Sequence, residues 1–172
     1  MSAADFTFHS NTTAFPFFYE INVIYEGTAA IFSITNTTTS SEDFYGSKIT
    51  TKSFDLATDG NTDTYTLSYV SNYQKANDYT VKLALSPQNG HYHFVKDADS
   101  SDTNTDLSLN YWENGTLMTK NLSEKENYTS TILIPSGRQK EDVLSFYLSW
   151  KGDTTLDVGD YSAVVSLFVS EN

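Results

Sequence analysis

The chain of 172 residues lacks cysteine altogether, contains only three prolines, and has ten lysines and arginines against 22 aspartates and glutamates. Without cysteine there can be no disulfide and no thiolate catalysis. The formal charge of −12 repels phosphate, so we expect no nucleic-acid partner. No run approaches 18 apolar residues, which predicts that no transmembrane segment is present. The opening MSAAD has neither the basic nor the apolar region of a secretory signal peptide.

Aromatic and small polar residues take the place of the missing types. The chain has 12 tyrosines and 11 phenylalanines, together with many Ser, Thr and Asn residues. This composition favours strands joined by polar turns over helices. The length is that of one domain, and no linker divides it, so we predict a single domain over residues 1–172.

Alternation of apolar and polar residues with a period of two predicts the strands. The clearest is at 15–27, and its short Glu-Gly connection favours a hairpin with a second strand at 28–35. Further strands are predicted at 47–56, 64–70, 79–86, 106–112, 115–120, 129–135, 142–150 and 161–170. The polar segments 36–43 and 96–106 are typical of loops, and 121–127 is the one segment that suggests a helical turn.

About ten short strands with closely spaced turns predict an all-β fold, an antiparallel immunoglobulin-like β-sandwich. Asn114-Gly115 is the preferred pair for a type I′ turn between two of these strands. The side chains that we expect in the core are Ile21, Val23, Leu67, Leu83, Leu85, Leu109, Ile132, Leu148, Val165 and Leu167.

Two stretches resemble a known group of proteins. The ending LDVGDYSAVVSLFVSEN, residues 156–172, is similar to the L-x-x-G-x-Y start of the final strand in bacterial fimbrial subunits and spore-coat-U-like domains. The middle, YTLSYVSNYQKANDYTVKLALS and then LNYWENG, resembles paired strands and a hairpin of the same surface proteins. Fimbrial subunits often carry a disulfide, which this chain lacks.

The resemblance implies a non-catalytic bacterial protein, exported to the extracellular space, the cell surface or the periplasm and built for assembly or adhesion. Its partners would then be other surface subunits or glycans. In that setting Gly159 permits a tight turn, and the Tyr161 ring packs inward while its hydroxyl bonds a neighbouring loop.

Two groups of residues suggest metal binding. Asp97, Asp99 and Asp102 form an oxygen-rich loop of the kind that calcium prefers, although the same residues are common in solvated turns. His91 and His93 are spaced to project from one strand face as a pair of metal ligands, or simply as exposed strand residues. We predict no obligatory metal or other cofactor, with calcium at the aspartate loop as the alternative.

Three aromatic residues are candidates for stacking on a sugar ligand: Trp112, Trp150 and Tyr111. The competing interpretation is that they lie in the core or pair across strands. No nucleophile motif, metalloprotease motif or nucleotide-binding glycine pattern occurs. A structural or adhesive surface module is therefore the first functional hypothesis. A carbohydrate-binding module is the second, and a hydrolase of unknown type on a β-sandwich is the third.

Overall fold

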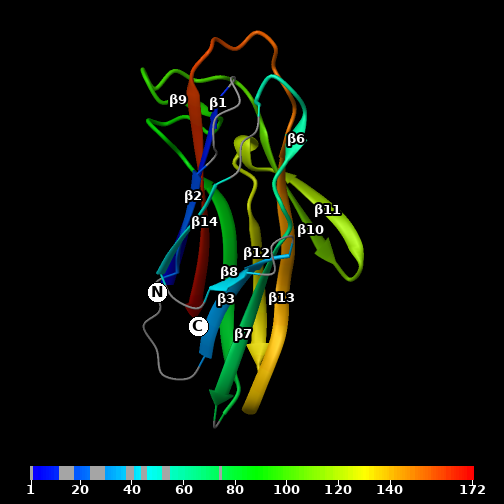
Figure 1. Ribbon diagram of the computed structural model, residues 1–172. Helices are drawn as coiled ribbons and strands as arrows, with labels where there is room; N and C mark the ends of the chain where they lie inside the picture. The colour runs from blue at the N-terminus through cyan, green and yellow to red at the C-terminus, as the bar shows by residue number, and fades with distance from the viewer. Residues whose placement is uncertain are drawn as a thin grey trace.

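Two antiparallel β-sheets pack face to face into an elongated sandwich in the computed structural model (Figure 1). The structure describes residues 2–11, 18–23, 30–37, 41–43, 46–51, 55–73 and 75–172. Within these ranges it describes side chains from residue 30 onward, except those of 41–43, 46–51 and Arg138. The predicted all-β antiparallel sandwich is confirmed. Within these ranges no helix is long and apolar enough to cross a membrane.

The first sheet contains seven strands in the order β12-β8-β14-β1-β2-β5, with the short β9 beside β14. Its strands are β1 (Ser2–Asn11), β2 (Phe18–Val23), β5 (Gly46–Thr51), β8 (Asn77–Ser86), β9 (Val95–Lys96), β12 (Tyr128–Ile134) and β14 (Asp160–Glu171). Both β8 and β14 therefore have a hydrogen-bonded neighbour on each side, which makes them the interior of this layer.

The second sheet also contains seven strands, in the order β11-β10-β13-β7-β3-β4, with the short β6 beside β13. Its strands are β3 (Ala30–Asn36), β4 (Ser41–Asp43), β6 (Gly60–Asn61), β7 (Tyr65–Tyr73), β10 (Leu107–Glu113), β11 (Thr116–Asn121) and β13 (Gly137–Trp150). The long strand β13 pairs with β7 along its first ten residues, through a register shift between Asp142 and Leu144, and with β10 near its end.

The predicted hairpin between residues 15–27 and 28–35 is wrong. β2 pairs with β1 and β5 in the first sheet, whereas β3 pairs with β4 and β7 in the second. Glu26-Gly27 is not one of the Asn-Gly or Asp-Gly pairs that fix a two-residue turn, so its local preference was weak. Pairing of β3 with the distant β7 along seven residues decides the topology instead.

Most of the predicted core is buried. The confirmed residues are Leu67, Leu83, Leu85, Leu109, Leu148, Val165 and Leu167. Ile132 is half-buried against them, and the side chains of Ile21 and Val23 lie outside the described residues. Aromatic rings join the two layers: Phe32 of β3 packs edge-on against Tyr79 of β8, with ring centroids 5.3 Å apart.

The closing strand β14 is an interior strand. It pairs with β8 on one side and with β1 on the other, the latter through ten residue pairs from Ser2–Val169 to Asn11–Asp160. Tyr161, Ala163, Val165 and Leu167 are buried and Val169 is half-buried, as the alternation predicts. The hydroxyl of Tyr161 donates to the carbonyl of Asp157 at 2.5 Å, so it does bond a neighbouring loop.

Several local predictions are also confirmed. Asn114 and Gly115 both have positive φ, 50° and 77°, as a type I′ turn requires. Residues Leu122–Glu124 form the single described 3-10 turn, capped by the Asn121 side chain. The strand predicted at 47–56 is shorter, because β5 ends at Thr51 and Leu56 is buried within a turn.

Candidate functional site

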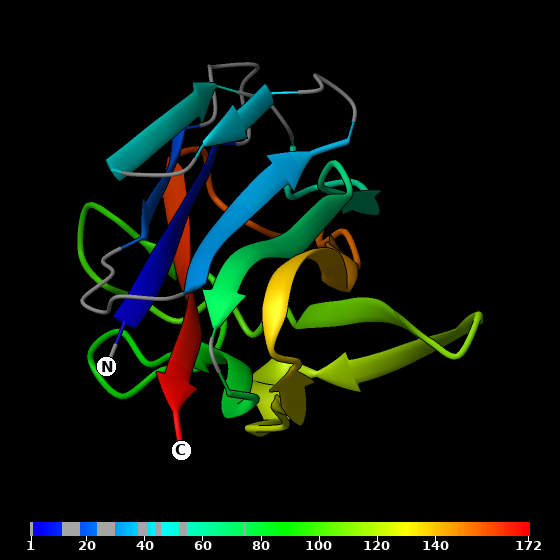
Figure 2. The same ribbon diagram turned by 90° about the horizontal axis from the view of Figure 1, so that it is seen from below.

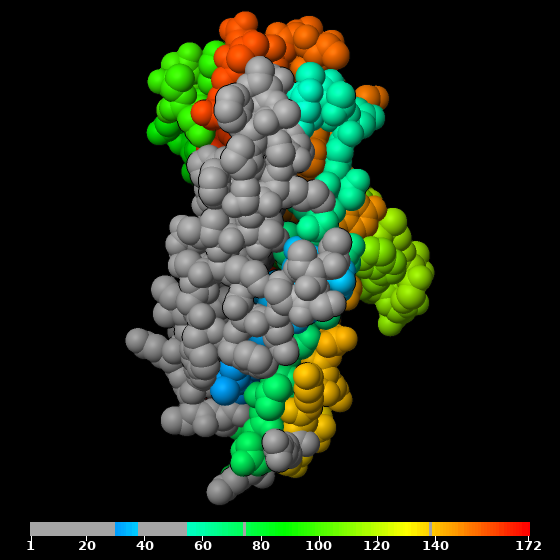
Figure 3. All heavy atoms as spheres, viewed as in Figure 1, coloured from blue at the N-terminus to red at the C-terminus, as the bar shows by residue number. Residues whose placement is uncertain are grey.

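Strands β10 and β11 form a hairpin, here called the arm (residues 107–121), that projects from the flank of the sandwich (Figures 1 and 2). In the space-filling view it stands out as a knob beside the body (Figure 3). The tight turn at Asn114-Gly115 allows the two strands to stay paired up to Glu113 and Thr116. The arm therefore presents a two-stranded surface with both faces accessible near its tip.

The outer face of the arm, on the side away from the first sheet, carries an aromatic pair, of which Trp112 is exposed and Tyr147 is half-buried. Trp112 is 41% exposed, and its ring lies 5.7 Å from the ring of Tyr147 on β13, tilted by 51°. Leu117 lies directly across the hairpin from Trp112 and is also exposed. Three large side chains, those of Trp112, Leu117 and Tyr147, therefore lie together on this outer face rather than in the core.

A row of hydrogen-bonded polar side chains adjoins this aromatic pair. Asn110 lies between Thr119 of β11 and Tyr147 of β13 in the register, so it is on the same face as Trp112. Its amide oxygen accepts from the Thr119 hydroxyl at 2.8 Å, and its amide nitrogen donates to Ser149 Oγ at 2.8 Å. These bonds hold the buried amide in one orientation and leave hydroxyl groups at both ends of the row.

The other two aromatic candidates belong to the core. Trp150 is 6% exposed, packs edge-on against Phe94 and donates its indole N–H to the Thr58 carbonyl at 3.0 Å. Tyr111 is 5% exposed and packs edge-on against Tyr128, with ring centroids 4.9 Å apart. Burial raises the pKa of Tyr111, with smaller contributions from nearby glutamates. The structure therefore retains one of the three predicted stacking residues, Trp112, on an accessible surface.

Tyr147 is the residue that the sequence analysis missed. The alternation in 142–150 contained the signal, because Leu144, Phe146 and Leu148 point to one face and Tyr147 must point to the other. The same rule separates Tyr111 from Trp112, since neighbouring residues of a strand cannot share one face.

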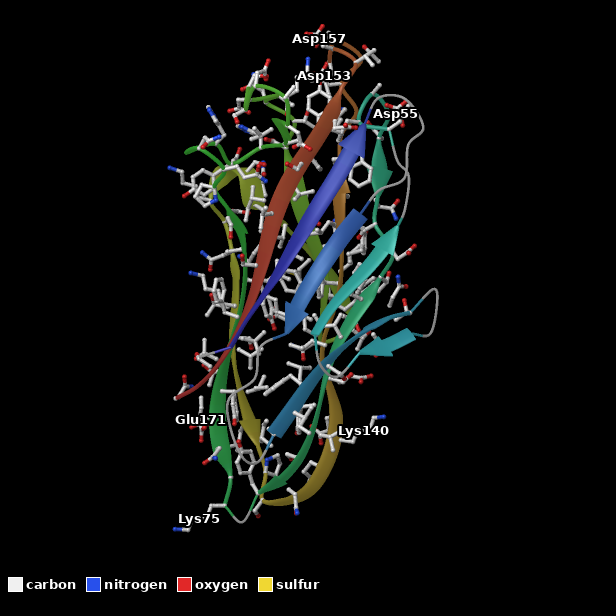
Figure 4. The ribbon with its side chains drawn as sticks, turned by 60° about the vertical axis from the view of Figure 1, so that its left-hand side comes forward. Asp55, Lys75, Lys140, Asp153, Asp157 and Glu171 are labelled. Atoms are coloured by element: carbon white, nitrogen blue, oxygen red, sulfur yellow. The ribbon has the colours of Figure 1, made fainter. Side chains whose placement is uncertain are left out.

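A second group of polar residues lies at one end of the sandwich. Asp55, Asp153 and Asp157 lie at this end, and Lys75, Lys140 and Glu171 lie at the other (Figure 4). The aspartate side chains here fix backbone turns: Asp153 accepts from the N–H and hydroxyl of Thr155, and Asp59 accepts from the N–H of Gly152 at 2.7 Å. This acidic end therefore uses its carboxylates for loop structure.

The three predicted calcium ligands bond to different partners. Asp97 accepts from the hydroxyl of Ser162 at 2.6 Å, and Asp99 accepts from the N–H and hydroxyl of Ser101. Asp102 accepts from the N–H of Asn104 and bonds two histidines. Over the described ranges, no group of three or more His, Asp or Glu side chains is arranged to hold a metal ion. Calcium binding remains a prediction from the sequence.

The predicted strand face at His91 and His93 is wrong, because β9 begins only at Val95, but the two imidazoles still converge on one carboxylate. Nδ1 of His91 lies 2.9 Å and Nδ1 of His93 lies 3.0 Å from oxygens of Asp102, and Nε2 of His93 lies 3.3 Å from Asp106. Burial opposes ionisation of Asp102, but the Asn104 N–H and the two imidazoles together lower its pKa. The group therefore joins residues 91–93 to the loop that follows β9.

No protein-family model matches the chain, and no curated protein sequence matches it. The resemblance to fimbrial and spore-coat-U-like proteins therefore remains a proposal. The geometry of the arm is a separate observation, and it bears on ligand binding.

Proposed function

We propose that the chain is a non-catalytic, exported module of a bacterial surface, and that it adheres to neutral carbohydrate through the outer face of the arm. The observation that carries this proposal is the pairing of the exposed Trp112 ring with the half-buried Tyr147 ring, beside the hydrogen-bonded Thr119–Asn110–Ser149 row.

The chemistry of this face suits a sugar ring. Aromatic rings carry negative charge density on their faces, which attracts the positively polarised C–H groups of a pyranose. The hydroxyls of Thr119 and Ser149 supply donors and acceptors for sugar hydroxyls at the edge of the ring pair. A formal charge of −12 repels uronic and sialic acids, so the glycan that fits best is uncharged.

Binding, rather than hydrolysis, is what the arm supports. Glycosidases use two carboxyl groups that flank the scissile bond. Glu113 is the only acidic residue between 107 and 121, and the strand alternation places it on the opposite face from Trp112. The resemblance of residues 156–172 to bacterial surface subunits supports a location outside the cytoplasm, at the surface or in the periplasm.

The decisive experiment measures retention on neutral polysaccharides, by a glycan array followed by affinity electrophoresis, for the native chain and for Trp112→Ala. We expect loss of the ring to weaken binding about tenfold, which corresponds to roughly 1.4 kcal/mol. Met118→Ala is the matched control, because Met118 is 39% exposed and lies on the other face of the same hairpin.

Tryptophan fluorescence gives a second readout. The chain has two tryptophans, and Trp150 is buried, so a change in accessible emission on adding a glycan reports on Trp112. Adding calcium or EDTA to the array tests the loop of Asp97, Asp99 and Asp102 as a separate contributor. Silence on every neutral glycan, or binding that Trp112→Ala leaves unchanged, contradicts the proposed function.

A further inference from the structure

Strand β12 forms an edge of the first sheet that lacks the usual protection. Among the described strands, and apart from the two-residue β6 and β9, each sheet ends in two edge strands: β12 and β5 in the first, β11 and β4 in the second. By sequence, β4 contains Glu42 and Asp43, β5 contains Lys48, and β11 contains Lys120. Charged residues on edge strands discourage pairing with another chain. β12 contains none, and the whole of 127–137 has no lysine, arginine, aspartate or glutamate.

The outward face of β12 is uncharged and carries one exposed leucine. Thr129, Thr131 and Leu133 alternate toward solvent, and Leu133 is 61% exposed. Five of its seven residues are β-branched or aromatic, none is proline or glycine, and it pairs with β8 on one side only among the described strands. An uncharged edge of this length with an exposed leucine is a template for a further strand.

We propose that a second copy of this chain adds its own β12 to this edge, antiparallel and centred on Thr131. About this centre Thr131 faces Thr131 of the second copy, and Leu133 faces Thr129 of the second copy, which covers the exposed leucine. The charge of −12 opposes the approach of an identical chain in general, and a strand edge without charged residues adds no local repulsion to it.

The neighbouring strand supports this register. In β8, Lys82 lies opposite Thr129 and Asp78 lies opposite Leu133. The two cross-strand rows through Thr129 and Leu133 therefore run from Lys82 of one copy to Asp78 of the other, while the central row through Thr131 ends at Thr80 in both copies. The first two rows place opposite charges at their two ends, and no like charges face each other across the new strand pair.

One pair of seven-residue strands is small for a protein interface, below the roughly 1,200 Å² of a stable complex, so the association should be weak and depend on concentration. Sedimentation velocity of the native chain over a wide concentration series should show a monomer at low concentration and a dimer at high concentration.

Charge substitutions at Thr131 test the register directly. In Thr131→Lys, two lysines would lie opposite each other, and in Thr131→Asp two aspartates would do so, so each variant alone should stay monomeric. An equimolar mixture of the two should dimerise again, because lysine then faces aspartate. Thr116→Lys is the matched control, because Thr116 is exposed on β11, an edge strand of the second sheet. This variant should dimerise like the native chain.

The outcomes separate the alternatives. Thr131→Lys makes the net charge less negative, so general repulsion between copies cannot explain a loss of dimer in that variant. A monomer at every concentration overturns the proposal. If both Thr131 variants still dimerise, the contact lies on another surface. If each variant is monomeric and the mixture does not dimerise either, the two-fold register is ruled out. Unchanged melting temperatures establish that the variants are folded.

Discussion

Replacement of Leu83 by alanine tests the packing at the centre of the first sheet. Leu83 is fully buried on β8, and the register places it between Tyr128 of β12 and Leu167 of β14. All three side chains point toward the second sheet. The substitution removes three carbon atoms from this row without altering the backbone hydrogen bonds on either side.

The magnitude follows from two terms. Loss of three buried methyl or methylene groups costs about 2.4 kcal/mol, at about 0.8 kcal/mol each. The cavity adds a further cost that depends on how far the surroundings relax, and measured Leu→Ala substitutions reach about 5 kcal/mol. Because β8 is held by strands on both sides, it has little freedom to move into the space. We therefore expect a loss of about 3–5 kcal/mol in the free energy of unfolding.

Urea denaturation at low protein concentration measures this loss as a shift of the midpoint with an unchanged slope. Leu83→Met keeps the volume and should cost less than about 1.5 kcal/mol. Leu133→Ala removes an exposed leucine from the neighbouring strand and should change stability by no more than about 0.5 kcal/mol. A loss below about 1 kcal/mol for Leu83→Ala would show that this position is loosely packed, which refutes the interior placement of β8.

Alternation identified the strands because it reports which side of a strand is buried. It worked for β8, where the buried residues follow the period of two along the strand, and for the apolar residues of β14. It could not identify partners, because the same alternation suits a hairpin and a pairing with a distant strand. The error at β2 and β3 arose there: two well-predicted neighbours in sequence lie in different sheets.

β14 shows a second limit of the pattern. The sequence predicts one buried face, yet Ser162 and Ser166 on the other face are also buried. Ser166 bonds Ser86 of β8 at 2.5 Å, and Ser162 bonds Asp97. In an interior strand, small hydroxyl-bearing side chains are buried by the larger side chains of neighbouring strands. Their polarity alone therefore does not indicate exposure to solvent.

The candidate site was partly predictable for the same reason. Trp112 was among the aromatic residues chosen from the sequence, and the phase of β10 separates it from buried Tyr111. What the sequence could not supply is the juxtaposition of Trp112 with Tyr147, which requires β10 and β13 to pair in register. At the acidic end, the His91 and His93 spacing predicted convergence, but the identity of Asp102 as their shared partner depends on the fold of the following loop.

Three further changes test the loops and the closing strand. Gly152→Ala should destabilise the fold, because a Cβ there would lie 2.4 Å from the backbone of Thr58; a melting temperature equal to the native one would contradict this contact. Asp102→Asn should lower stability at neutral pH, because the lowered pKa of Asp102 in the folded protein stabilises the fold above pH about 3.9, the pKa of unfolded aspartate. This stabilisation is lost as the pH falls through the folded-state pKa. Melting temperatures of the native chain and the variant should therefore converge in acid. A chain ending at Asp157 should be insoluble or bind hydrophobic dyes, because removal of β14 leaves β8 and β1 without the strand between them and uncovers the buried residues from Tyr161 to Leu167. Adding a peptide of residues 156–172 should partly restore the solubility of the truncated chain, since strand addition returns both the backbone hydrogen bonds and the core side chains. A truncated chain that folds cooperatively by itself would instead show that the two halves of the first sheet hold together without their central strand.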